Sequence, residues 1–233
     1  MRFVIMRYTV SGTTLQVVEI ELEAGEAVFT ESGGMSWMSE NIEMDTGVKG
    51  GLFGGLKRKM SGESAFMTTY RATAPAKITF GSEFIGKVID LDLEAGKSVV
   101  CQKDSFMCAQ EGVQLDIHFQ KKLGAGLLGG EGFILQKVTG PGLAFLEIDG
   151  EIVEKDLAQG EKLKVDPGYV AAFEPSVTYD MERIKGIKNM LFGGEGIFIA
   201  TVTGPGKVWL QTMPRPTVAN SLMKYMPVGR STG

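Results

Sequence analysis

Three glutamates stand at matching places in the chain, each just after a glycine-rich stretch. Glu131 and Glu195 follow a double glycine directly, and Glu63 follows one after the insertion LKRKMSG. Carboxylates that a fold brings together can bind a cation or hold a proton. Alternatively, each glutamate accepts hydrogen bonds from backbone N–H groups of its own glycine turn. The sequence leaves both interpretations open, and it assigns no metal site.

The same glycine-rich stretches carry basic side chains. Segment 47–62 has four basic residues and no acidic one, although the whole chain has a formal charge of −4. If these stretches meet at one end of the molecule, their basic residues form a basic collar around exposed Leu and Phe side chains, which suits an anionic membrane surface, an anionic ligand or an acidic partner. The alternative is that the apolar side chains fill the core and the lysines solvate its rim. The candidate residues are Lys57, Arg58, Lys59, Lys121, Lys122, Arg183, Lys185 and Lys188.

Motifs for catalysis are absent from the sequence. His118 is the only histidine, so neither a multi-histidine metal site nor more than one triad is available. Cys101 and Cys108 have neither metal-ligand nor Cys-x-x-Cys spacing. The glycine patterns at 124–129 and 81–87 resemble nucleotide-binding loops, but a strand pattern follows each where a helix is required. We therefore expect no enzyme activity and no cofactor.

Composition narrows the class of protein. The chain has 233 residues, 43% of them hydrophobic, which is enough for a substantial core. Acidic residues slightly outnumber basic ones, which argues against a nucleic-acid partner. The presence of two cysteines and the lack of an apolar leader favour a cytoplasmic location. The basic collar suggests that the protein could also contact a membrane surface peripherally. No apolar stretch approaches the roughly 20 residues of a membrane-spanning helix.

An internal repeat is the most informative feature. Residues 126–142 and 190–206 share 10 of 17 positions, at an offset of 64. LEAGE at 22–26, GLFGG at 51–55 and Ala-Pro-Ala at 74–76 indicate a more divergent first copy. We predict a single compact unit over 1–233, without linkers. The predicted repeats span about 10–80, 81–146 and 147–213, and a C-terminal tail spans 214–233.

Within each copy the apolar period is two, which is typical of half-buried strands. In VVEIELE at 17–23 and VIDLDLE at 88–94 the apolar residues alternate with acidic ones. Turn residues punctuate the strands, and only residues 217–226 suit a short helix. The predicted fold class is all-β, with three tandem repeats, each like a β-sandwich or double-stranded β-helix, packed around a pseudo-threefold axis.

The LEAGE, GGEGFI and VTGPG elements in three copies resemble a large family of mitochondrial-biogenesis proteins, of the altered-inheritance-of-mitochondria type. The resemblance covers nearly the whole chain. It implies a fold similar to the trp RNA-binding attenuation protein, and it implies no catalytic mechanism. The first copy departs from the pattern at Gly-Glu-Ser 62–64 and at Ala-Pro-Ala 74–76.

Two classes of function remain open at this point. The first is a non-enzymatic scaffold or binding module that forms homo-oligomers, because sheet edges and glycine-rich surfaces readily pair. The second is a peripheral binder of an anionic membrane surface or anionic ligand through the basic collar. Binding studies of charge-reversed variants distinguish the two.

Overall fold

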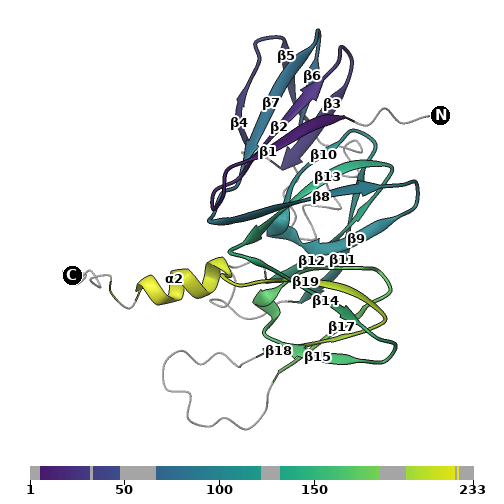
Figure 1. Cartoon of the computed structure of the whole chain (residues 1–233), viewed down its shortest axis with the longest axis vertical. Helices are drawn as coiled ribbons and strands as arrows, with labels where there is room; N and C mark the ends of the chain where they lie inside the picture. Colours follow the sequence, from purple (N-terminus) through teal and green to yellow (C-terminus); the bar gives the residue numbers. More distant parts are fainter. Residues whose placement is uncertain are drawn as a thin grey trace.

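Antiparallel strands make up most of the chain, with one short helix near the C-terminus (Figure 1). The computed structural model describes residues 6–31, 34–47, 67–121, 132–183, 198–223 and 225. The all-β prediction is confirmed. The strands are β1 (Arg7–Ser11), β2 (Val17–Leu22), β3 (Ala27–Glu31), β4 (Met35–Met38), β5 (Ile42–Gly47), β6 (Met67–Ala72), β7 (Ala76–Gly81), β8 (Gly86–Leu93), β9 (Ser98–Gln102), β10 (Phe106–Gln110), β11 (Gln114–Lys121), β12 (Phe133–Thr139), β13 (Gly142–Asp149), β14 (Ile152–Leu157), β15 (Lys162–Val165), β16 (Val170–Phe173), β17 (Thr178–Arg183), β18 (Phe198–Thr203) and β19 (Gly206–Gln211).

One scheme of strand pairing occurs three times along the chain. In the first set, β2 pairs with β7 and β3 pairs with β6. The same two pairs recur as β8 with β13 and β9 with β12, and again as β14 with β19 and β15 with β18. Strand β4 pairs with β7 through a β-bulge, as do β10 with β13 and β16 with β19. We call these strand sets unit 1 (β2–β7), unit 2 (β8–β13) and unit 3 (β14–β19).

The units are joined in an open row. Strand β3 of unit 1 pairs with β10 of unit 2, and β9 of unit 2 pairs with β16 of unit 3. The described strands hold no matching pair between β15 and β4, because β15 is one edge of its sheet and β4 is an edge of another. Figure 1 shows the units one below the other along the long axis. The predicted closure around a pseudo-threefold axis is therefore not confirmed.

The described strands form four stacked sheets with three hydrophobic clusters between them. The sheet orders are β1-β2-β7-β4, then β5-β6-β3-β10-β13-β8, then β11-β12-β9-β16-β19-β14, then β15-β18-β17. Each cluster contains residues from two successive sheets: Ile20 with Val28 in the first, Phe29 with Val99 in the second, and Val100 with Val202 in the third. The two six-stranded sheets therefore bury both faces, so that every residue of β13 is buried.

Polar residues end the stack on both sides. In unit 1, Lys77 and Thr79 occupy the positions on β7 that Leu143 and Phe145 occupy on β13, as the registers with β2 and β4 and with β8 and β10 show. Lys77 contacts Glu19 and Glu21 across the outer face of the first sheet. The outer residues of β17 are likewise exposed. Such polar end faces are typical of capping repeats.

Helix α2 (Arg215–Met223) projects from the body beside unit 3 (Figure 1). None of its residues is buried, and Leu222, Met223 and the following Tyr225 are exposed. The predicted helix at 217–226 is thus present, beginning two residues earlier. In the described part of the chain, no helix has the length and apolar character needed to cross a bilayer.

Candidate functional site

Most of the residues that the sequence analysis singled out lie outside the described part of the chain. This holds for Glu63, Glu131, Glu195, Lys57, Arg58, Lys59, Lys122, Lys185 and Lys188. Whether the three glutamates meet stays a prediction.

Lys121 and Arg183 are described, and the structure brings their strands together. Lys121, the last residue of β11, donates a hydrogen bond through Nζ to the carbonyl oxygen of Met181 on β17. Its Nζ also lies 5.8 Å from the centroid of the Phe198 ring. Arg183 ends β17 and is the cross-strand partner of Phe198. Two of the basic glycine-rich stretches therefore begin at neighbouring strand ends.

A second group of polar residues was not singled out by the sequence analysis. Glu147 and Asp149 lie two residues apart at the end of β13, so they share one face of the strand. Both are buried, at 7% and 9% exposure. Buried carboxylates require a compensating charge or hydrogen bonds. Arg215, the first residue of α2, supplies both.

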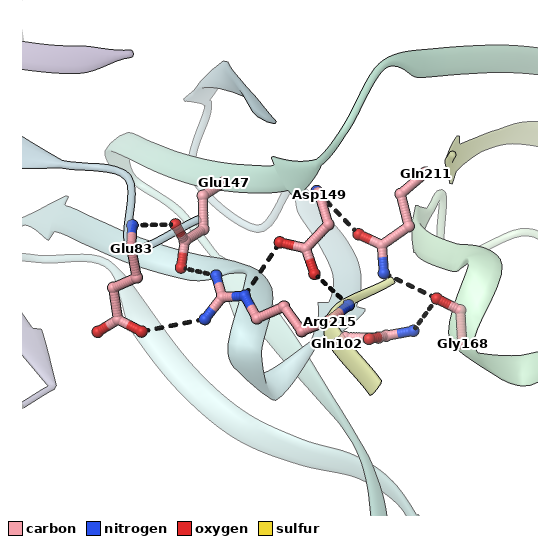
Figure 2. Close-up of polar contacts among 7 residues, drawn as sticks. All are labelled: Glu83, Gln102, Glu147, Asp149, Gly168, Gln211 and Arg215. Atoms are coloured by element: carbon pink, nitrogen blue, oxygen red, sulfur yellow. Dashed lines mark hydrogen bonds and ion pairs between the residues drawn. The ribbon is translucent and has the colours of Figure 1, made fainter. Parts of the chain in front are cut away.

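The Arg215 guanidinium joins three carboxylates (Figure 2). Its Nε donates to Asp149 Oδ1 at 3.0 Å, its Nη1 donates to Glu83 Oε2 at 3.0 Å, and its Nη2 donates to Glu147 Oε1. The backbone N–H of Arg215 donates to Asp149 Oδ2 at 3.1 Å, so this carboxylate holds the start of the helix. The second oxygen of Glu147 accepts from the Glu83 N–H at 2.9 Å. We call Glu83, Glu147, Asp149 and Arg215 the Arg215 cluster.

Glutamine side chains extend the cluster into unit 3. The Asp149 N–H donates to Gln211 Oε1 at 3.1 Å, and Gln211 Nε2 donates to the Gly168 carbonyl at 2.7 Å. Gln102 Nε2 donates to the Val170 carbonyl at 2.6 Å and lies 3.4 Å from the same Gly168 oxygen (Figure 2). Through these bonds the cluster ties the end of unit 2 to unit 3 and to α2.

Burial and pairing act against each other in this cluster. Burial raises the pKa of Glu147 above the ordinary value of a carboxyl, while Arg215 and the Glu83 N–H act in the opposite direction. Burial lowers the pKa of the Arg215 guanidinium, but Glu147 and Asp149 outweigh it and hold this pKa above its ordinary value. Arg215 is therefore charged at every physiological pH, and it stabilises the carboxylates around it.

A cavity of about 120 Å³ opens beside the cluster, between units 1 and 2. Its lining includes Gly34 and Gly81 from unit 1 and Phe106 and Met107 from unit 2. Four carboxylates but only two cationic side chains line it, so the lining carries an excess of negative charge. The charged lining residues are Glu31, Glu83, Asp104, Glu147, Lys103 and Arg215.

The described residues contain no group of three His, Cys, Asp or Glu side chains that could hold a metal ion. His118 is exposed on β11, with its ring edge-on to Phe173 at 6.2 Å between centroids, and burial of part of the ring lowers its pKa. Cys101 and Cys108 are buried thiols. Burial raises the pKa of Cys101 to about 12, which makes this thiol a poor nucleophile.

A pattern in the sequence indicates part of the Arg215 cluster. In LAFLEID the acidic residues Glu147 and Asp149 occupy alternate positions next to buried apolar ones, which marks them as candidates for buried carboxylates. Arg215 has no such mark, because it is separated from Asp149 by 66 residues and lies in the polar tail.

Comparison with known proteins gives three findings. An uncharacterised protein of Streptococcus pyogenes serotype M6 is 28% identical over 231 residues, which cover 95% of this chain and 92% of that protein. The crystal structure of a Streptococcus pyogenes protein, a structural genomics target, matches with a TM-score of 0.77 and 24% identity over 95% of this chain and all of that one; it supports the fold. A family model described as "Mitochondrial biogenesis AIM24" matches residues 8–213.

Proposed function

We propose, from the premise that this chain belongs to the mitochondrial biogenesis AIM24 family, that it is a non-enzymatic, oligomer-forming scaffold that binds a cationic group beside Arg215. The observation that carries the binding role is the acidic excess in the lining of the cavity between units 1 and 2. The Streptococcus pyogenes serotype M6 relative is described as uncharacterised, so the chemistry of the cavity is the main guide to a ligand.

The size and charge of the cavity suggest the class of ligand. A volume of about 120 Å³ corresponds to roughly four water molecules at ~30 Å³ each. It accommodates the head group of a lysine or arginine side chain, or a small organic cation. Glu83 is the best placed contact, because its side chain is 65% exposed while one of its oxygens is fixed by Arg215.

Titration with methylguanidinium, followed by NMR chemical shifts, tests the cation site. Shifts are expected at Glu83, Asp104 and Met107. Glu83→Gln removes one exposed carboxylate and should weaken binding about two- to fivefold, the range for an exposed charge pair. Glu43→Gln, on the exposed side of β5, is the matched control and should leave the affinity unchanged. Equal affinities of the two variants, or shifts caused by acetate and not by the cation, would contradict the proposal.

A second candidate function is contact with an anionic membrane surface. It is favoured by the placement of Lys121 and Arg183, whose strands meet through the bond from Lys121 to Met181. Strands β11 and β17 thus end close to one another, and each is followed in the sequence by a basic stretch. A combined positive charge next to the Leu and Phe residues of these stretches suits the interface of an anionic bilayer.

Flotation with vesicles that contain phosphatidylserine tests this second function. The combined change Lys57→Glu, Arg58→Glu and Lys59→Glu should weaken binding about a hundredfold, because each of the three basic residues near an anionic surface contributes about 1 kcal/mol. Lys155→Glu, on exposed positions of β14, is the control. Lack of wild-type binding at both low and physiological salt would exclude the membrane role.

A further inference from the structure

The two edge strands at the ends of the row differ from their equivalents inside it. Strands β3, β9, β10 and β16 all pair with a strand of the neighbouring unit, and their residues are almost all buried. Strands β4 and β15 occupy the equivalent places at the two ends. No strand of the described chain pairs with their outer edges, and their residues are partly or fully exposed.

We propose that β15 of one copy pairs with β4 of a second copy, and so repeats between chains the junction that joins the units within one chain. This inference deepens the oligomer-forming part of the proposed function and is independent of the cation site. The second copy is the partner because the chain already contains two examples of the junction, at β3–β10 and β9–β16. An open edge with free backbone groups is a template for such strand addition.

The internal junctions fix the register of the proposed pair. Ala172 on β16 pairs with Cys101 on β9, and the following Phe173 pairs with Val100. The bulge between β4 and β7 places Trp37 at the position of Ala172 and Met38 at that of Phe173.

The residues of β15 follow from its pairing with β18. On β15, the equivalent of Cys101 is Val165, and the equivalent of Val100 is Lys164. Trp37 should therefore face Val165 of the second copy, and Met38 should face Lys164.

Side chains at the two edges complement one another. Trp37 is 56% exposed, although its equivalents Cys108 and Ala172 are completely buried against the preceding unit. Addition of a second copy at β4 would cover this indole ring, which burial of apolar surface favours.

Charges at the two edges are also opposite. At the first internal junction the N–H of Glu111, just after β10, donates to the Ala27 carbonyl at 2.9 Å. The carboxylate of Glu111 pairs with Arg71 of unit 1 at 2.8 Å. The equivalent of Glu111 is Glu40, and the equivalent of Ala27 is Lys162, so the proposed pair brings a carboxylate next to an ammonium group.

Lys164 limits the strength of the association. Its equivalents Phe29 and Val100 pack in the hydrophobic clusters between successive units, whereas Lys164 is exposed and forms a 3.9 Å ion pair with Glu182. A lysine on an edge strand opposes strand addition, so the wild-type contact should be reversible and depend on concentration. Because the two edges differ, the contact is head-to-tail and produces a ring or a filament rather than a symmetric dimer.

Disulfide trapping between separately made variants tests the pairing. A Trp37→Cys chain mixed with a Val165→Cys chain under mild oxidation should give a covalent dimer, because directly paired residues have the Cα spacing of a disulfide. The buried native thiols Cys101 and Cys108 should not react. Met44→Cys mixed with Val165→Cys is the matched control, since Met44 is exposed on β5, the edge strand of a different sheet from those of β4 and β15, and it should give no dimer. Lys164→Val should strengthen association about tenfold in sedimentation experiments.

The outcomes separate this inference from the broader proposal. A trapped dimer only in the first mixture, together with stronger association of Lys164→Val, supports the pairing. Wild-type oligomers without selective trapping would overturn the edge pairing and leave an oligomer-forming scaffold with another interface. A wild-type chain that sediments as a 25.1 kDa monomer at every concentration, and stays monomeric as Lys164→Val, would overturn both.

Discussion

Arg215→Ala is expected to lower the free energy of unfolding by about 3 kcal/mol, at the lower end of the range for breaking a buried ion pair. The substitution leaves Glu147 and Asp149 buried without their cation, and it removes the hydrogen bonds of the guanidinium to three carboxylates. The side chain of Arg215 is 27% exposed, and for this reason we expect the lower end of the range. Urea denaturation followed by circular dichroism measures the change.

Two controls test whether the buried carboxylates cause this loss. Lys77→Ala removes ion pairs with Glu19 and Glu21 on an exposed sheet face, where ion pairs contribute little, so its loss should be clearly smaller than that of Arg215→Ala. Arg215→Lys keeps the charge but loses the planar group that reaches three carboxylates, so it should lie between the alanine variant and wild type. Equal losses for Arg215→Ala and Lys77→Ala would show that the cluster does not stabilise the fold.

The loss in Arg215→Ala should shrink as the pH falls. Burial already raises the pKa of Glu147, and removal of Arg215 takes away the main opposing effect, so the folded-state pKa rises further. A carboxyl whose folded-state pKa exceeds its unfolded value of about 4.5 contributes stability that is fully present below the unfolded value. This contribution is lost as the pH rises through the folded-state pKa. The variant should therefore come closest to wild type at acidic pH, and a deficit that grows on acidification would contradict this explanation.

Local patterns in the sequence predicted much of the fold. The alternation in VVEIEL placed Val18, Ile20 and Leu22 on one face, and all three are buried against the second sheet. The same alternation placed Ile89, Leu91 and Leu93 inward on β8. Leu91 and Leu93 are buried in the second cluster, and Ile89 packs against that cluster but is only partly buried. These predictions succeeded because one face of each of these strands lies on a core, which is the condition under which period-two patterns arise.

The joining of the units could not be predicted in the same way. Strands β3 and β10 form a junction through backbone hydrogen bonds, which carry no residue preference of their own. The stretch LAFLEID is buried on both faces, so its apolar run shows burial but not which sheet covers it. A repeated pattern is compatible with units around an axis of symmetry and equally with units in an open row, so the repeat alone does not distinguish the two arrangements.

The candidate site was predictable only in part, because its residues are far apart in the sequence. Residues Glu147 and Asp149 stand out as acidic groups at the end of an apolar strand, but their partner Arg215 comes from the tail. Of the basic residues, Lys121 and Arg183 gain a defined place at the ends of β11 and β17. Their importance for a membrane or a ligand stays a prediction.

Amide hydrogen exchange at β4 and β10 tests the open row of units most directly. The two strands have the same position and the same bulge in their units, but among the described strands a neighbour pairs with the outer edge of β10 and not with that of β4. The amide of Glu111, which donates to Ala27, should exchange slowly. The equivalent amide of Glu40 should exchange about a thousandfold faster or more, at a dilution where the chain sediments as a monomer. Equal protection of Glu40 and Glu111 in the monomer would mean that β4 and β15 pair within one chain, and the row would then be a closed ring.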